Sequence, residues 1–218
     1  MSTNVETYIH AGLTIEIDTD EDCRNPRKDH DNAGKLVIYE GHDFMGVNEL
    51  GGTFFPPQDY PSWDALDDAV QAAFPKAEIL PVYRYEHSGV AYNTTGFNDP
   101  WDSGRVGFTL CTYATMLHEW GKKIVTKGVR EKARACMVSE LSEYSAWANG
   151  DCYAFAVLDP DGEELESCCG FIGDIDYVKS QAEASAEACA PRLPSPEARE
   201  ATKEHYATER AGQLRMMG

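Results

Sequence analysis

The sequence has no long apolar run, and its first residues lack the basic and apolar regions of a signal peptide. A membrane helix needs roughly 18 consecutive apolar residues, so a membrane-spanning segment is not expected. The missing leader predicts a cytoplasmic protein. A hydrophobic content of 42% is nevertheless enough for a sizeable core, which excludes wholesale disorder.

The common catalytic and metal-binding motifs are also missing. There is no Gly-rich phosphate loop, no Gly-x-Ser-x-Gly elbow and no His-Glu-x-x-His pair, which disfavours the enzyme classes that use them. The seven cysteines are odd in number and show no CxxC spacing, so we expect buried free thiols in place of disulfides or a zinc site. Aspartates crowd residues 18–31, but Arg24, Arg27 and Lys28 interrupt them. We therefore predict no cofactor and no metal.

Basic residues are scarce, with 19 Lys and Arg against 37 Asp and Glu, and the formal net charge is −18. Residues 40–104 hold 11 acidic and 2 basic residues, and residues 135–187 hold 12 acidic and one basic. The one basic segment, residues 122–134, is too short for the broad positive footprint of a nucleic-acid-binding protein. The charge predicts either solubility alone or attraction to a basic partner, without direct binding of nucleic acid.

Alternating and short apolar runs predict strands. Leu13, Ile15 and Ile17 alternate with polar residues, which predicts a strand or a hairpin that turns near Ala11 and Gly12. Apolar character predicts a central strand over 35–40, and further strands are expected over 78–86, 90–92 and 105–113. The Asp-Gly pair within 159–162 predicts a hairpin between 152–158 and 164–170.

Apolar spacings of three and four residues predict helices over 63–74, 127–148 and 174–190. Ser62 is the expected N-cap of the first, and the basic segment begins the second, where Glu131, Glu140 and Glu143 offer charge partners. We predict an α+β fold, with a mainly antiparallel sheet and helices packed on one face. Residues 1–190 are expected to form a single domain, followed over 191–218 by an extension with a charged C-terminal helix at 196–214.

The segment from His87 to Phe108 mixes turn formers, aromatic residues and polar residues between two predicted strands. Such connections often carry function on a rigid scaffold. A nucleophile, a base and an orienting acid can be drawn from His87, Asp102 and Ser103, assisted by Asp99 or Asp43. Turns use the same residue types, because their side chains bond the local backbone, and in that interpretation Trp101 is tucked into the core.

Several blocks together resemble a set of small acidic proteins found in bacteriophages and mobile elements. The Pro-Trp-Asp-Ser-Gly stretch is the most specific, and the similarity extends over roughly residues 8–180. The blocks that carry it are 25–27, 31–34, 85–89, 99–108, 150–155 and 167–173. The resemblance implies a phage or mobile-element context and a bacterial host cell, and it implies no mechanism.

Two hypotheses follow. The first is a non-enzymatic protein that inhibits a bacterial defence complex, of the anti-CRISPR or anti-restriction type, by placing carboxylates where the complex binds nucleic acid. The acidic residues expected to contact the basic partner are Asp64, Asp67, Asp68, Glu140, Glu143, Asp159, Asp161, Glu163 and Glu164. The alternative is a hydrolase that acts on a nucleotide or a nucleic-acid end through His87, Asp102 and Ser103.

Overall fold

The computed structural model describes residues 3–40, 44–52, 55–192, 197–198 and 200–201. Their contacts group into two compact units. The smaller unit is built from residues 1–19, 153–169 and 175–218, and the larger from 20–152 and 170–174. The sequence predicts one domain over 1–190, and the structure divides that range into two units. The division arises because residues 14–19 pair with residues 153–158, so that segments from both ends of the range form the smaller unit. The predicted helix at 196–214 lies almost wholly outside the described residues.

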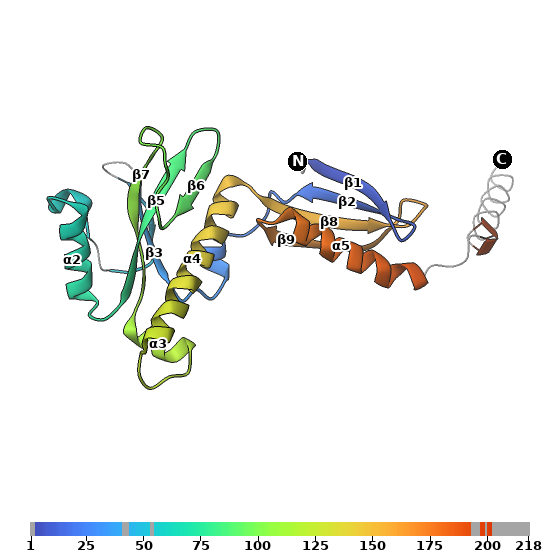
Figure 1. The fold of residues 1–218 in the computed structure, drawn as a ribbon. Coiled ribbons are helices and arrows are strands. Elements are labelled where there is room, and N and C mark those ends of the chain that lie inside the picture. The colour runs from blue at the N-terminus through green and yellow to red at the C-terminus, as the bar shows by residue number, and fades with distance from the viewer. Residues whose placement is uncertain (1–2, 41–43, 53–54, 193–196, 199, 202–218) are drawn as a thin grey trace, which may run out of the picture. The chain divides into compact units, whose positions relative to one another are not determined.

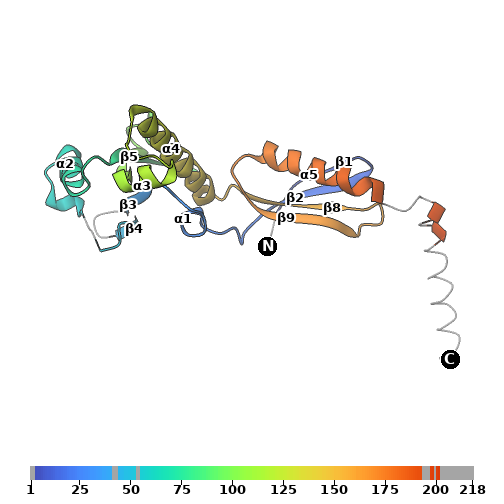
Figure 2. The same cartoon turned by 90° about the horizontal axis from the view of Figure 1, so that it is seen from below.

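The smaller unit is a four-stranded sheet with one helix. Its strands follow the order β1-β2-β8-β9, and β9 forms one edge. Their bounds are β1 Asn4–His10, β2 Leu13–Thr19, β8 Cys152–Leu158 and β9 Glu164–Ile172. Helix α5 (Ile175–Cys189) lies along one face of this sheet (Figure 2), where it buries Val178, Ala182 and Ala186. Both predicted hairpins and the predicted inward alternation of Leu13, Ile15 and Ile17 are confirmed.

The larger unit contains a five-stranded antiparallel sheet in the order β4-β3-β7-β5-β6. Its strands are β3 Lys35–Glu40, β4 Phe44–Asn48, β5 Glu78–Glu86, β6 Val90–Asn93 and β7 Ser103–Cys111. Its helices are α1 Pro26–Asp29, α2 Trp63–Ala73, α3 Tyr113–Glu119 and α4 Lys127–Asn149. Short 3₁₀ turns occupy Pro57–Asp59 in this unit and Ala190–Arg192 after α5. None of the described helices is long and apolar enough to cross a membrane.

The α+β class with antiparallel sheets is confirmed, but the helices do not all lie on one face. Helix α2 covers one face of the five-stranded sheet and α4 covers the other (Figure 1). The cause lies in β3, whose successive residues are buried on both sides. Val37 packs in the α2 cluster, whereas Leu36 and Ile38 pack in the α4 cluster. A central strand without a polar side needs cover on both faces.

The centre of this sheet depends on a close backbone approach. A Cβ atom added to Gly107 of β7 would lie 2.0 Å from the carbonyl oxygen of Val37 on the paired strand β3. Only glycine fits at this point. Nearby, the register of β5 shifts between Val82 and Tyr83, directly after Pro81. A bulge or irregularity of β5 therefore lies close to Pro81, in an interior strand of the sheet.

Helix α4 is tied to the sheet by a buried carboxylate. Glu78 at the start of β5 has a side chain that is only 7% exposed. Nε of Arg134 donates to its Oε2 at 2.6 Å, and Nη1 of Arg130 donates to its Oε1. The basic segment thus pairs with acidic neighbours, through Glu78 and, among the three predicted partners, through Glu131, which lies 3.8 Å from Lys127. Glu140 and Glu143 pair instead with Arg27 and His30. Burial disfavours ionised Glu78, but the two arginines outweigh it and lower its pKa.

The lowered pKa of Glu78 predicts an acid-sensitive contribution to stability. A carboxylate with a depressed folded-state pKa stabilises the fold above its unfolded pKa, and this contribution disappears as the pH falls through the folded value. At pH 7, Glu78→Gln should cost about 1.5–3 kcal/mol, the usual size for hydrogen bonds to a charged group. In urea unfolding, the difference in free energy of unfolding between Glu78→Gln and the unsubstituted protein should become smaller as the pH falls below about 4.3, the ordinary Glu pKa.

The matched control is Glu131→Gln, at an exposed position of helix α4, which should change the free energy of unfolding by no more than about 0.5 kcal/mol. A difference between the Glu78→Gln variant and the unsubstituted protein that stays constant from pH 7 to pH 3 would contradict the assignment.

Candidate functional site

The connection from β6 to β7 is a structured turn. Oδ1 of Asp99 accepts hydrogen bonds from the backbone N–H groups of Trp101 and Asp102, at 2.9 and 3.1 Å. The hydroxyl of Ser103 donates to the carbonyl oxygen of Asp99. The N–H groups of Asp102 and Trp101 stabilise the ionised form and lower the pKa of Asp99. The polar residues of this loop therefore bond the local backbone, as turn residues do.

The structure brings together two of the three residues of the hydrolase hypothesis. Nδ1 of His87 lies 3.0 Å from Oδ2 of Asp102, and both side chains are well exposed. Ser103 has its hydroxyl on the Asp99 carbonyl. A nucleophilic serine needs its hydroxyl on the base, so the observed bond is that of a turn residue. Asp43 lies outside the described residues.

Trp101 is not in the core, and this part of the turn interpretation is wrong. Its side chain is 92% exposed. The bonds of Asp99 close the chain into a tight turn at the start of β7, and Trp101 lies at its tip. No apolar periodicity surrounds Trp101 in the sequence, so no neighbouring residue indicated which way the indole points.

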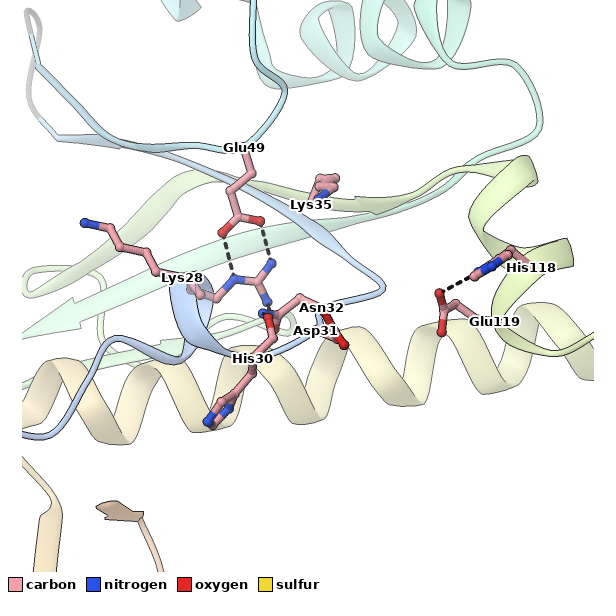
Figure 3. Close-up of a pocket in the computed structure, with 9 residues that line it drawn as sticks. Lys28, His30, Asp31, Asn32, Lys35, Glu49, His118 and Glu119 are labelled. Atoms are coloured by element: carbon pink, nitrogen blue, oxygen red, sulfur yellow. Dashed lines mark hydrogen bonds and ion pairs between the residues drawn. The ribbon is translucent and has the colours of Figure 1, made fainter. Parts of the chain in front are cut away.

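The larger unit is held by a buried arginine. The side chain of Arg27 is 4% exposed, and its guanidinium donates to Glu49 at 2.6 and 2.9 Å (Figure 3). It also donates to Oε2 of Glu140 at 3.2 Å, to Oδ1 of Asn32 at 2.7 Å and to the carbonyl oxygen of Gly34 at 2.6 Å. Burial opposes the charge, but Glu49 and Glu140 outweigh it and raise the pKa of Arg27.

This network occupies Glu140, which the sequence placed among the partner-binding residues. The Glu140 side chain is 11% exposed. Besides Arg27, its oxygens accept the N–H groups of Ala33 at 2.7 Å and Gly34 at 3.0 Å. The thiol of Cys136 lies 3.3 Å away as a further donor. Glu140 therefore builds the protein interior and is not available to a partner.

A polar pocket of about 560 Å³ adjoins this network (Figure 3). Arg27 and Glu49 form part of its wall and are satisfied by each other, and His118 is bonded to Glu119 at 3.1 Å. The labelled side chains of Lys28 and His30 point away from Glu49 and from each other. The wall mixes charges of both signs and does not gather one set of groups around a common centre.

The other acidic residues predicted in the larger unit differ in their surroundings. Asp64 and Asp68 are exposed on α2. Asp67, on the same helix, is bound by the guanidinium of Arg105 at 2.5 and 2.9 Å. Glu143 on α4 lies 3.3 Å from Nδ1 of His30. Asp64 and Asp68 are therefore accessible to a partner, whereas Asp67 is bound to Arg105.

The remaining predicted residues, Asp159, Asp161, Glu163 and Glu164, lie together in the smaller unit, at the tip of the β8–β9 hairpin. Asp159 shapes the turn, because its Oδ1 accepts the N–H groups of Asp161 and Glu163 at 2.7 and 3.0 Å. Every residue from 161 to 170 is exposed. In residues 3–19, 153–169 and 175–191 of this unit there are eleven acidic residues against one lysine, Lys179, which is bound to Glu6 at 2.6 Å.

The seven cysteines are all free thiols, as predicted. Cys111, Cys152 and Cys189 are buried, whereas Cys168 and Cys169 are exposed on β9. In the described parts of the chain, no three His, Cys, Asp or Glu side chains gather where they could hold a metal ion. In the aspartate-rich segment, Asp20 instead accepts the backbone N–H groups of Asp22 and Gly170.

Comparison of the chain with protein-family models, with curated proteins and with solved structures found no match. The function is therefore inferred from the sequence and the geometry of the chain itself.

Sequence analysis missed the residues that do most to hold the larger unit together. Nothing in the sequence indicated a role for Glu49, Glu78 and Arg105, and Arg27 stood out only as an interruption of the aspartate-rich segment, because each pairs with a residue far along the chain. The one available signal was the scarcity of basic residues in an acidic chain, which makes each arginine a candidate for a structural ion pair.

Removing the buried guanidinium should severely destabilise the protein. Arg27→Met leaves Glu49 and Glu140 buried without their counter-charge, which typically costs about 3–5 kcal/mol. Equilibrium urea unfolding checks this, with Lys28→Met as the control because Lys28 is exposed on the next position and should lose at most about 0.5 kcal/mol. Equal losses for the two variants would show that the Arg27 network does not hold the fold.

Proposed function

We propose that the chain is a non-enzymatic binding protein of a bacteriophage or mobile element. Its acidic smaller unit engages a basic surface of a bacterial defence complex, of the anti-CRISPR or anti-restriction type, and blocks the site where that complex binds nucleic acid. The observation that supports the proposal is the concentration of eleven carboxylates against one lysine in residues 3–19, 153–169 and 175–191 of this unit.

The contrast between the two units supports this view. In the larger unit, Glu49, Glu78, Glu140 and Asp67 are bound by arginines and serve the fold. In residues 3–19, 153–169 and 175–191 of the smaller unit, the one lysine is bound to Glu6, and the sequence has no lysine or arginine from 152 to 178. Such an excess of carboxylates over cations creates a negative field that attracts and steers a basic surface.

The geometry of β9 suits mimicry of a nucleic-acid backbone. Side chains on one side of a strand repeat about every 6.8 Å, so Glu164 and Glu166 place carboxylates at that interval. One strand of a DNA duplex carries a charge about every 3.4 Å along the axis. Glu164 and Glu166 therefore place negative charges at a regular interval on an exposed edge strand, as a phosphate backbone does.

The hydrolase is the second candidate, supported by the 3.0 Å contact between His87 and Asp102. It is the weaker one, because the hydroxyl of Ser103 is bound to a backbone carbonyl. His87, Asp102 and Ser103 do not line the polar pocket beside the Arg27 network.

Charge reversal on the hairpin tests the binding proposal. The chain should protect an infecting phage in bacteria that carry an active CRISPR or restriction system, measured as plating efficiency. The triple variant Glu163→Lys, Glu164→Lys, Glu166→Lys should lose this protection at least about 100-fold. Binding to the purified complex should also weaken steeply from about 50 to 200 mM salt, because the attraction acts between exposed charges.

The matched control reverses Glu119 and Glu131, two exposed acidic residues of the larger unit, and should retain protection within about threefold. Protection by the hairpin variant equal to that of the unsubstituted chain, or the absence of protection against every system tested, would overturn the proposal.

A separate assay addresses the hydrolase. Ser103→Ala and His87→Ala should leave phage protection unchanged, since neither residue belongs to the acidic hairpin. If the purified chain hydrolyses nucleotides or nucleic-acid ends, and both substitutions lower the rate by more than about 100-fold, the second candidate replaces the first.

A further inference from the structure

Trp101 is exposed in a way that the other three tryptophans are not. Its side chain is 92% exposed at the tip of the turn that leads into β7. Trp63 lies under the guanidinium of Arg105, 4.7 Å from its ring centre, and Trp147 packs against Tyr144 at 5.8 Å. Trp120 packs against the cluster around Met116. Of the four tryptophans, only Trp101 presents its ring to water, and tryptophan is enriched at protein–protein interfaces.

The turn that presents Trp101 is rigid before any partner arrives. Asp99 accepts hydrogen bonds from the backbone N–H groups of Trp101 and Asp102, at 2.9 and 3.1 Å, and the hydroxyl of Ser103 closes the same turn. At the other end of the connection, Oδ1 of Asn93 accepts the N–H groups of Thr95 and Gly96 at 3.1 and 2.7 Å. A ring held on an ordered turn loses little conformational entropy when it is bound.

The turn is also braced by the neighbouring hairpin. The N–H of Glu86 donates to the carbonyl oxygen of Asp102 at 2.9 Å, and His87 contacts the carboxylate of Asp102 at 3.0 Å. The hairpin is fixed to α4, because the N–H of Val90 donates to Oδ1 of Asn149 at 3.1 Å. Trp101 is thereby connected to the core of the larger unit through backbone and side-chain bonds.

We propose that Trp101 is the anchor of a protein-docking surface, and that the partner is a protein with an apolar pocket for the indole ring, bordered by lysine or arginine side chains. Tryptophans dominate binding energy when they fill such pockets in protein interfaces. The inference goes beyond the proposed function, because it concerns a different unit of the chain and a different type of contact.

The charges around the ring determine the nature of the partner. The carboxylates of Asp99 and Asp102 flank Trp101 in sequence, and Glu86, which is paired with Arg84 at 2.9 Å, is exposed on the adjoining hairpin. A nucleic acid, an anionic membrane surface and a second copy of this chain, with its net charge of −18, would all bring negative charge to these groups. A basic border around an apolar pocket complements both the ring and the carboxylates.

Site-specific photo-crosslinking identifies what covers the ring. p-Benzoylphenylalanine replaces Trp101 in one version of the full chain and, as the matched control, Ile124 in another. Ile124 is 69% exposed in the same unit. Both versions are irradiated in bacterial cells that carry the gene, and crosslinked peptides are sequenced by mass spectrometry. The expected adduct at position 101 is a single protein, joined at an apolar pocket with neighbouring Lys or Arg, and absent from the position 124 version.

The identified protein is then purified, and its affinity for the full chain is measured. Trp101→Ala should weaken binding about 30- to 900-fold, the range for a hot-spot tryptophan, while Trp101→Phe should retain affinity within about tenfold. Ile124→Ala should bind within about twofold of the unsubstituted chain. Because Trp101 is exposed, all three variants should unfold at the same urea concentration.

Adducts scattered over many proteins, adducts to nucleic acid or to a second copy of the chain, or equal affinities for Trp101→Ala and Ile124→Ala would overturn the inference. A single pocket-bearing protein that is not part of a defence complex would support it while contradicting the proposed function. Loss of phage protection in the hairpin variant, together with unchanged protection in Trp101→Ala and no adduct at position 101, would support the proposed function and overturn the inference about Trp101.

Discussion

The larger unit depends on one buried guanidinium. Arg27 reaches from the short helix α1 into a site where Glu49, after strand β4, and Glu140, on helix α4, approach from two other parts of the chain. Every nitrogen of its guanidinium has an acceptor, and Glu140 also fixes the backbone at Ala33 and Gly34. An unpaired carboxylate at this depth would be costly, so the position of each of these elements requires the other two.

The same principle explains how an acidic chain folds despite its net charge. In the larger unit, Arg27, Arg105, Arg130 and Arg134 bind carboxylates that are buried or partly buried, as Arg130 and Arg134 do at Glu78. The smaller unit has no such need, because α5 and the inner faces of β2 and β8 form an apolar core. Its carboxylates remain at the surface. The fold therefore separates acidic residues that hold structure from acidic residues that are open to a partner, and this separation underlies the proposed function.

The local structure of the chain could be predicted from its sequence, and the long-range pairs could not. Apolar spacing located α2, α4 and α5, Ser62 caps α2 through the N–H of Ala65, and the Asp-Gly pair marked the β8–β9 hairpin. These features depend on neighbouring residues. The pairing of Arg27 with Glu140 joins positions 113 residues apart, and nothing in either neighbourhood indicates the other. Sequence analysis consequently counted Glu140 as a surface residue and placed Trp101 in the core.

Carbodiimide labelling of carboxylates, mapped by mass spectrometry on the native protein at neutral pH, tests the separation of acidic residues most directly. Glu163, Glu164 and Glu166 should be labelled rapidly, while Glu49, Glu78 and Glu140 should stay unlabelled until urea unfolds the chain. Labelling of Glu140 at the rate of Glu164 in the folded protein would contradict the account, because it would place the Arg27 network in open solvent.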